Sequence, residues 1–320
     1  MKLIIQIPCL NEEETLAEVL ADIPESIPGI NTIETMIIDD GSTDGTVDLA
    51  HRLNVDHVIS HPRNLGLAKA FQTGIEEALR QGADIIVNTD GDHQYPGSAI
   101  PSLVELIRSG QADIALGDRQ VQSIPHFSPI KKFFQAVGNI VVRRVSGADI
   151  NDAVSGFRAY SREAALRFTI LTQFSYTLDT IIQAGSQGMV IKSVPIETNG
   201  PTRPSRLAKG IYPFVKAQAA TILRLYVFYE PLRTFTYIAS PLLIAGSILL
   251  IRFFWTYFFK DGSRFVQSVS IGSGFLIVGI LIFLVGVQAD IANKHRILTQ
   301  ETLYRLKKLE LEQHKRKTTD

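Results

Sequence analysis

DIIVNTDGDHQYP, residues 84–96, is the stretch of sequence that decides the fold. Its short apolar run ends at Asn88, and two aspartates, Asp90 and Asp92, then follow on either side of a glycine. An apolar run of this length that is bounded by turn residues predicts a buried strand. In an open parallel sheet, ligands bind beyond the carboxyl ends of the strands. We therefore expect Asp90 and Asp92 to lie at the ligand-binding edge of a sheet.

The sequence around this stretch alternates between strand and helix. Between Lys2 and Gly117, the runs LIIQI, TMII, HVIS and DIALG have the composition of strands, and the segments between them have helical periodicity. In the first of these segments, Asn11 followed by Glu14 predicts a helix start. A further helix and strand are expected to end at Pro195. This order predicts an α/β fold of the Rossmann type, with a mostly parallel sheet and helices on both faces.

The DGD sequence has the donors of a metal site. Asp90 and Asp92 can hold one hard cation through their carboxylates, and Gln94 is close enough in sequence to add a third oxygen ligand. An isolated DGD after a strand is more often only a turn. The metal prediction therefore depends on what lies beside this loop.

Two other predicted strands also end in acidic residues. Glu12 follows the first strand, and Asp39 and Asp40 follow the second. Their oxygens can accept hydrogen bonds from a base or a ribose. Three strand ends with carboxylates at one sheet edge predict a single nucleotide pocket and favour the metal interpretation of the DGD sequence.

The composition excludes some classes of function. Among 320 residues, Lys plus Arg and Asp plus Glu are both 32, so no overall positive field is available to bind nucleic acid. The single cysteine, Cys9, excludes an internal disulfide and a multi-cysteine metal site.

Two long apolar stretches near the carboxyl end predict membrane spans. Thr234–Phe259 and Val269–Ala289 each reach the roughly 20 residues of one crossing, with a buried hairpin as the alternative. Asn199–Gly210 is a candidate hinge, and the interrupted apolar face of Leu207–Tyr229 predicts a helix in the headgroup region. The tail, Lys294–Asp320, holds eight lysines and arginines against four acidic residues, which predicts that it lies in the cytoplasm. Because two spans return the chain to the side it left, the catalytic domain is expected to be cytoplasmic too. The expected division is a catalytic domain over 1–200, a hinge and interfacial helix over 201–231, two transmembrane helices over 232–290 and a basic cytoplasmic tail over 291–320.

Six sequence elements together resemble a known family. They are IPCLNEEETL, IIDDGSTDGT, RNLGLAKAF, TDGDHQYP, GDR and SGFRAYSREA. They are similar to those of family 2 glycosyltransferases with the GT-A fold, above all the dolichol-phosphate mannose synthase and polyprenyl-phosphate glycosyltransferase group. The resemblance covers roughly residues 2–230. It implies inverting transfer of a hexose from GDP-mannose or UDP-glucose to a membrane-bound polyprenyl phosphate, with Mg²⁺ or Mn²⁺ as cofactor.

The resemblance also implies roles for single residues. The implied metal ligands are Asp90, Asp92 and Gln94. The implied nucleotide-sugar-binding residues are Pro8, Leu10, Glu12, Asp39, Asp40, Asp90, Gly91 and Asp92. An acceptor phosphate is already anionic, so cations matter more than a base for positioning it. The candidates are Arg158 first, then Arg119, Arg203, Arg206 and Lys209, although the last three also fit a basic segment attracted to anionic lipid.

A general base is not assigned by the resemblance. Phe157 stands where some polyprenyl-phosphate glucosyltransferases have a carboxylate. Asp152 and Asp179 are the available carboxylates, and we rank both below Asp92 and Arg158 as catalytic residues.

Alternative functions are separated by sequence features. A processive polysaccharide synthase would carry a Gln-x-x-Arg-Trp motif, and a sugar nucleotidyltransferase would open with a glycine-rich loop; the chain has neither. A transferase that acts on a glycan or protein, and a non-catalytic membrane scaffold, stay open. Gly272, Gly274 and Gly279 in the second predicted span allow packing against a second copy of the chain.

Overall fold

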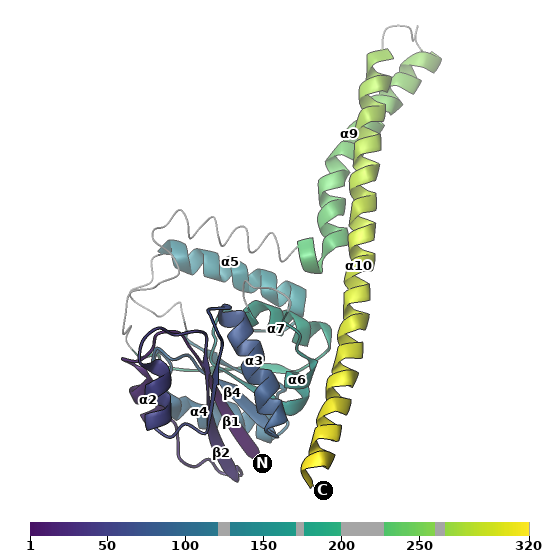
Figure 1. Cartoon of the computed structure of the whole chain (residues 1–320). Coiled ribbons are helices and arrows are strands. Elements are labelled where there is room, and N and C mark those ends of the chain that lie inside the picture. Colours follow the sequence, from purple (N-terminus) through teal and green to yellow (C-terminus); the bar gives the residue numbers. More distant parts are fainter. Residues whose placement is uncertain (121–128, 171–175, 200–226, 260–265, 320) are drawn as a thin grey trace. The chain divides into compact units, whose positions relative to one another are not determined.

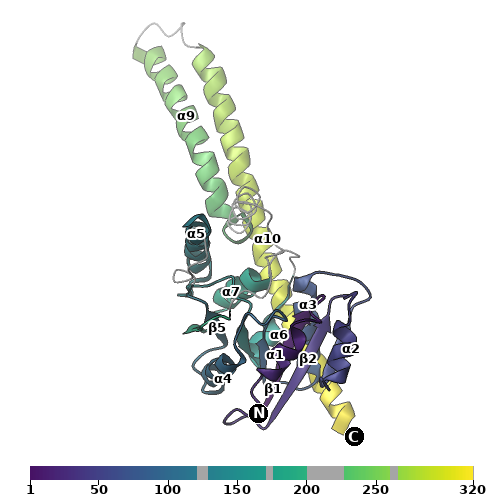
Figure 2. The same cartoon turned by 90° about the vertical axis from the view of Figure 1, so that its left-hand side faces the viewer.

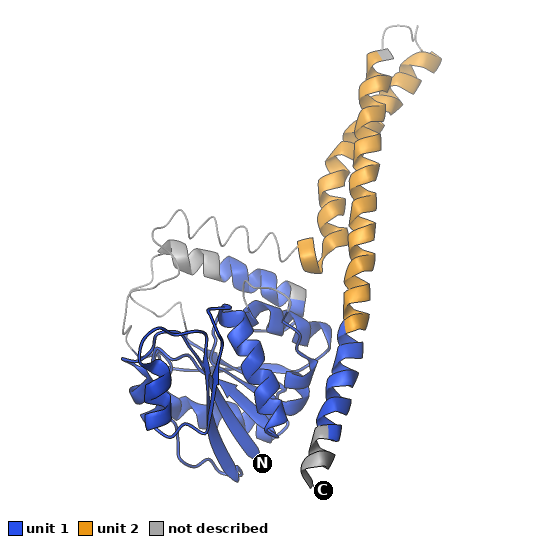
Figure 3. Cartoon of the chain, in the orientation of Figure 1, with its two compact units in different colours: residues 1–214, 300–320 blue, residues 215–299 orange. Residues whose placement is uncertain are grey.

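The computed structural model describes residues 1–120, 129–170, 176–199, 227–259 and 266–319. Two compact units make up the chain (Figure 3). The first comprises Met1–Phe214 and Gln300–Asp320, and the second comprises Val215–Thr299. The first unit is an α/β domain, and the described part of the second is dominated by two long helices.

A seven-stranded sheet forms the centre of the first unit, in the order β3-β2-β1-β4-β6-β5-β7. Its strands are β1 (Lys2–Cys9), β2 (Thr32–Asp39), β3 (His57–Ser60), β4 (Ile85–Asn88), β5 (Ile114–Asp118), β6 (Arg158–Ser161) and β7 (Ile191–Pro195). The five strands expected before Arg119 are confirmed, and the predicted later strand ends at Pro195 as expected. The sheet is mostly parallel, as predicted.

Strand β6 is the exception to the parallel pattern. It lies between β4 and β5 and is antiparallel to both, with Arg158 opposite Asn88. Its four residues, RAYS, are too few to show a period, and the sequence prediction did not include them as a strand. As a result, the SGF segment (residues 155–157), which precedes β6, is placed beside the end of β4.

Helices cover both faces of the sheet, as predicted (Figures 1 and 2). One core contains α1 (Leu16–Ala21), α2 (Thr46–Arg52) and α4 (Ile100–Arg108); the other contains α3 (Leu67–Arg80), α6 (Arg162–Arg167) and α7 (Tyr176–Ser186). Successive side chains of β1 point to opposite faces of the sheet, so Leu3 and Ile5 belong to the first core and Ile4 belongs to the second. The one-turn helix η1 (Gly97–Ala99) precedes α4, and α5 (Pro129–Ser146) lies between β5 and β6 in sequence.

The first helix begins later than its sequence predicts. Asn11 is not its N-cap, because the residue has a φ of 55° and its side-chain oxygen accepts a hydrogen bond from the Thr43 amide, 2.8 Å away. Helix α1 begins only at Leu16. The intervening residues remain a loop at the end of β1, and this loop belongs to the candidate site.

The second unit contains the predicted spans. Helix α9 (Pro231–Phe259) and helix α10 (Val266–Thr319) are long and apolar enough to cross a membrane. Large apolar side chains such as Trp255 and Phe258 are more than half exposed. That surface suits a lipid environment better than water.

The small residues of α10 pack within this helix pair. A Cβ on Gly272 would lie 3.1 Å from Leu249, and one on Gly279 would lie 2.7 Å from Leu243, so both glycines permit close approach of α9. Gly274 has no neighbour within 4 Å of such a Cβ. Two of the three glycines are therefore used within the chain, which removes most of the sequence argument for packing against a second copy.

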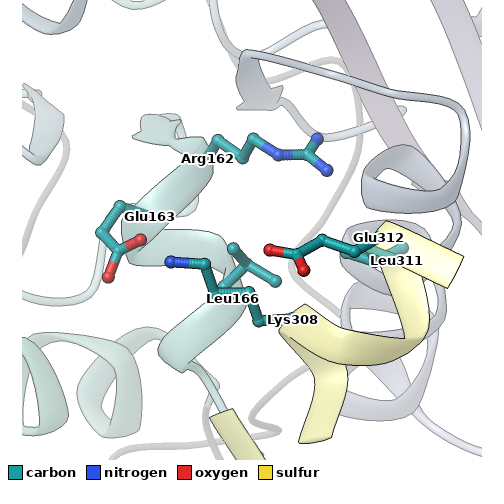
Figure 4. Close-up of a pocket in the computed structure, with 6 residues that line it drawn as sticks. All are labelled: Arg162, Glu163, Leu166, Lys308, Leu311 and Glu312. Atoms are coloured by element: carbon teal, nitrogen blue, oxygen red, sulfur yellow. The ribbon is translucent and has the colours of Figure 1, made fainter. Parts of the chain in front are cut away.

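The predicted basic tail forms the end of a helix that packs on the α/β domain. Helix α10 continues without a break to Thr319, and Gln300–Asp320 is grouped with the α/β domain rather than with the spans. Tyr304 and Leu311 pack against the core formed by α3, α6 and α7. A cavity of about 320 Å³ lies where the end of α10 meets α6 (Figure 4). The predicted hinge and interfacial helix lie almost entirely outside the described residues.

Candidate active site

Three loops meet at the carboxyl ends of neighbouring strands. Strand β1 pairs in parallel with both β2 and β4, so the segments after Cys9, Asp39 and Asn88 emerge at the same sheet edge. The hydroxyl of Thr15 joins two of them, because it donates to Gly91 O at 2.6 Å and to the Glu12 carboxylate at 3.2 Å. The structure therefore brings the predicted acidic strand ends together.

Asp39 and Asp40 organise the loops around this edge. Asp39 is buried and accepts a hydrogen bond from the Ser42 amide at 3.0 Å. Asp40 accepts from the amides of Leu65 and Gly66 at 2.9 and 2.8 Å, and a ring nitrogen of His61 lies 2.8 Å from the same carboxylate. Asp40 thus fixes the loop before α3, which is a role that its sequence position alone did not indicate.

Gly91 allows the first and third loops to touch. A Cβ at this position would lie 3.1 Å from the sulfur of Cys9 and 3.1 Å from Cγ of Glu12. Pro8 and Glu12 are buried, and Leu10 is half-buried between them. A side chain on Gly91 would therefore push apart the residues predicted to bind the nucleotide.

The DGD loop, residues 90–94, concentrates negative charge. Burial, and secondarily the charge of Asp92, raise the pKa of Asp90 to about 7, and Glu12 acts in the same direction. The carboxyl group is enclosed by protein atoms although Asp90 as a whole keeps some exposure. Asp92 also accepts a hydrogen bond from the Gln94 amide at 3.1 Å. A bound cation would stabilise the ionised form of carboxylates that lie close together and repel each other.

The donor set fits a hard cation with incomplete protein ligation. Within the described residues, no group of three or more His, Cys, Asp and Glu side chains is placed to hold a metal. Asp90 and Asp92, together with the side-chain oxygen of Gln94, would supply only part of an oxygen coordination shell. Mg²⁺ is usually held in this way, by one or two carboxylates together with substrate phosphates and water.

A buried polar network lies directly beneath the DGD loop. Asn88 accepts from the Gln6 amide group at 2.8 Å and donates to Gly156 O at 2.8 Å. Gly156 lies against Asp90, because a Cβ there would be 3.2 Å from its carboxylate, and Tyr176 blocks the other side at 2.7 Å. Asn88 and Gly156 were missed as site residues. The only signal in the sequence was a polar residue at the end of an otherwise apolar strand.

The structure argues against the predicted role of Arg158 in binding the acceptor phosphate. Its side chain is completely buried, and its guanidinium donates to four acceptors at 2.8–2.9 Å. These are Ala153 O, Ser155 O, Thr177 O and the hydroxyl of Thr180. The donors that the phosphate would need bind the chain itself, so Arg158 connects the SGF segment to α7.

Arg119 is placed differently. It directly follows β5, and its guanidinium forms a two-pronged contact with Asp152 at 2.6 and 2.9 Å. Asp152 is fully buried and makes this ion pair, which argues against the predicted role as a general base. The charge of Arg119 lowers the pKa of Asp90, against the effects of burial and of Asp92, so the guanidinium is electrostatically close to the DGD loop.

The remaining predicted residues are one aspartate of α7 and three cations of the predicted hinge. Asp179 is buried near the start of α7. Arg203, Arg206 and Lys209 lie outside the described residues. Their predicted roles stay predictions.

Asn199 is a contact of the DGD loop that the sequence prediction missed. Its amide nitrogen donates to Gln94 O, and its side-chain nitrogen donates to His93 O, both at 3.0 Å. His93 has a φ of 55°, in the left-handed region that side chains rarely adopt. Asn199 therefore holds the strained part of the loop to the chain that leaves β7.

Comparison with known proteins decides the family. The model of glycosyl transferase family 2 matches residues 4–168, just over half of the chain, and this range contains the strand-end loops and the SGF segment. The chain belongs to glycosyl transferase family 2. Over 172 residues, this glycosyltransferase is 36% identical to a dolichol-phosphate mannosyltransferase of Pyrococcus furiosus, covering 51% of the chain and 47% of the relative. It therefore spans about half the length of that protein.

Another relative is similar over its whole length. Glycosyltransferase AglJ of Haloferax volcanii is 26% identical over 317 residues, covering 95% of this glycosyltransferase and 96% of the relative. Glucosyl-3-phosphoglycerate synthase of Mycobacterium tuberculosis, solved with Mn²⁺, UDP and its product, superposes with a TM-score of 0.53 at 19% identity. That match covers 71% of this chain and 78% of the other, and it shows the GT-A fold.

Proposed function

We propose that this glycosyltransferase moves a hexose from a nucleotide-diphosphate sugar to a polyprenyl or dolichyl phosphate, with inversion at the anomeric carbon. The observation that carries the proposal is the convergence of the Glu12, Asp39 and DGD loops at one sheet edge, with Arg119 beside them. The name of the Pyrococcus relative supports a lipid-phosphate acceptor, and GDP-mannose and UDP-glucose are the candidate donors.

The strand-end loops would bind the donor. Glu12 and Asp39, at the ends of β1 and β2, would accept hydrogen bonds from the base and ribose, and Asp40 keeps the adjoining loop in place. Asp90, Asp92 and Gln94 would hold Mg²⁺ or Mn²⁺, which would supply positive charge to stabilise the diphosphate leaving group. This role agrees with the crowded carboxylates of the DGD loop.

The reaction needs positioning more than proton removal. An oxygen of the acceptor phosphate forms the new bond to the anomeric carbon, while the bond from that carbon to the nucleotide diphosphate breaks. The phosphate oxygen is already anionic near neutral pH, so no side chain has to deprotonate it. Arg119 would orient this anion, since an arginine matches the geometry of a phosphate. The buried state of Asp152 agrees with a reaction that lacks a carboxylate base.

The acceptor and the helix pair suggest a location. We propose that α9 and α10 cross the membrane and that the α/β domain and the carboxyl terminus lie on its cytoplasmic side. The exposed apolar side chains of both helices support the first part. The excess of lysine and arginine after residue 293 supports the second. Labelling of cysteines introduced at Ser109 and at Lys294 in intact and opened vesicles tests the orientation.

Transfer of radiolabelled sugar tests the reaction. Purified full-length protein is incubated with polyprenyl phosphate and with GDP-mannose or, separately, UDP-glucose, in Mn²⁺ or in EDTA. We expect metal-dependent labelling of extractable lipid from one donor and its loss in Asp92→Ala. The exposed Asp48 on α2 supplies the matched control, Asp48→Ala. Donor hydrolysis without lipid labelling would contradict the acceptor and favour a glycan or protein acceptor instead.

A further inference from the structure

We propose that Asp152 is a positioning residue, which holds the guanidinium of Arg119 in the orientation that receives the acceptor phosphate. The inference rests on the proposed function, because it concerns the acceptor part of the same site. In this role Asp152 does not transfer a proton. It orients Arg119, and Arg119 is the cation that binds the acceptor phosphate.

The contact between the two side chains fixes the guanidinium plane. Nε of Arg119 lies 2.6 Å from one carboxylate oxygen of Asp152, and Nη2 lies 2.9 Å from the other. The Arg119 amide adds a third contact with the carboxylate at 3.3 Å. Two of the five guanidinium N–H groups point to Asp152, and the other three are directed away from it. A two-pronged contact of this kind sets both the direction and the rotation of the donors.

Burial prevents Asp152 from acting on a substrate directly. Asp152 has no exposed surface, whereas the side chain of Arg119 keeps 12% of its surface exposed. Of the two partners, only Arg119 reaches the surface, so Arg119 is the group through which this ion pair can act on the acceptor. The pair also leaves neither charge buried alone, which would be costly.

The location of the pair connects it with the donor. Arg119 directly follows β5, and its positive charge is felt at the Asp90 carboxylate and at the hydroxyl of Tyr95. The hydroxyl of Tyr95 in turn accepts a hydrogen bond from the Gly156 amide at 3.3 Å. A phosphate held by Arg119 would therefore lie near the DGD loop, which is expected to bind the diphosphate of the donor.

The segment that contains Asp152 is itself held in place by Arg158. Arg158 binds Ala153 O and Ser155 O at 2.9 and 2.8 Å, so the residues after Asp152 are fixed to the buried β6. The carbonyl oxygen of Asp152 accepts from the Ser155 amide at 3.3 Å. Arg158 thus supports the segment that orients Arg119. An immobilised arginine loses less conformational entropy when it binds phosphate, and this favours affinity.

The experiment is a double-mutant cycle on the full-length protein in detergent. The variants are Arg119→Gln, Asp152→Asn and the double variant, with Asp149→Asn as the control because its side chain is 94% exposed. Binding of a short isoprenyl phosphate and of the nucleotide sugar are measured separately, together with kcat for sugar transfer. We expect Asp152→Asn to weaken isoprenyl phosphate binding on the order of tenfold to a hundredfold and to leave donor binding unchanged.

The double variant distinguishes positioning from an independent role. If Asp152 acts only through Arg119, the double variant binds the isoprenyl phosphate no more weakly than Arg119→Gln alone. Additive losses would overturn the inference, and so would unchanged acceptor binding with a lower kcat, which is the behaviour of a catalytic base. If Asp152→Asn does not fold, Asp152→Glu keeps the charge but shifts the guanidinium, and wild-type binding in that variant would equally overturn it.

The cycle also separates this inference from the proposed function. Wild-type protein that binds no isoprenyl phosphate refutes the lipid acceptor and the positioning role together. Wild-type binding that survives in Asp152→Asn refutes only the positioning role.

Discussion

The ammonium group of Lys307 donates a hydrogen bond to the main-chain oxygen of Phe168, 2.8 Å away. Phe168 is the C-cap of α6, and the end of a helix is where a cation is stabilised. Arg167 of the same helix lies 4.2 Å from the ring centre of Tyr304 and 3.6 Å from the carboxylate of Glu301. A cavity lined by residues of α6 and of the end of α10, Leu166 and Leu311 among them, lies between the same two elements (Figure 4). The carboxyl-terminal segment is therefore part of the α/β domain.

Shortening Tyr304 should destabilise the α/β domain. Tyr304→Ala removes an aromatic ring that packs against the core and against Arg167, and we expect a loss of ~1–2 kcal/mol in the free energy of unfolding. Leu309→Ala on the same segment is the control, since Leu309 is 55% exposed and should change stability little. Denaturant unfolding of the two variants measures the difference. Equal stability would mean that the segment does not pack in solution.

Replacing Arg158 should affect folding rather than acceptor affinity. Arg158→Gln leaves several buried acceptors without their donor, and we expect a loss of about 3 kcal/mol or more. Lysine should not restore stability, because one ammonium group cannot reach all four acceptors. Arg80→Ala, at an exposed site on α3, is the control. A stable Arg158→Gln protein with a raised KM for the lipid would restore the original prediction.

Removing the Asn199 side chain should weaken metal binding. Asn199→Ala loses the hydrogen bond to His93 O, so the strained DGD loop is less firmly held, and we expect the activating Mn²⁺ concentration to rise roughly tenfold. The exposed Ser98, which follows the same loop, supplies the control Ser98→Ala. Titration of Mn²⁺ against transfer rate and against melting temperature checks this. An unchanged metal dependence in both measurements would contradict it.

The acidity of Asp90 should make metal binding depend on pH. Its pKa in the metal-free protein is raised from 3.8 to about 7, so protons compete with a cation below that value. The sign for stability follows from the same shift. Without metal, the folded state binds more protons than the unfolded chain between about pH 4 and pH 7, so stability falls as pH rises through that window.

Mn²⁺ should reverse this trend. We expect the rise in melting temperature caused by Mn²⁺, relative to EDTA at the same pH, to be larger at about pH 8 than at about pH 6. Asp92→Ala, which removes one metal ligand, should show little Mn²⁺ effect at either pH. An equal Mn²⁺ effect at both values would argue against Asp90 as a ligand.

The sequence by itself determined the strands other than β6, the acidic strand ends and the two apolar helices. These features depend on local pattern: a buried strand is a short apolar run, and the carboxyl ends of neighbouring parallel strands must share an edge. The loops after Cys9, Asp39 and Asn88 could therefore be placed together before any coordinates were known. The six resembling elements were sufficient to indicate the family.

Only the tertiary structure decided which charged side chains face the site. Arg119 and Arg158 look alike in sequence, yet one remains partly exposed and paired with Asp152, whereas the other is buried and donates mainly to main-chain oxygens. Strand β6 was too short to recognise, and its antiparallel insertion turns Arg158 into a structural residue. The contacts of Asp152, Asn199 and the end of α10 could not be predicted from the sequence either. Their partners lie 33, 106 and 139 residues away in sequence, and local patterns do not record such contacts.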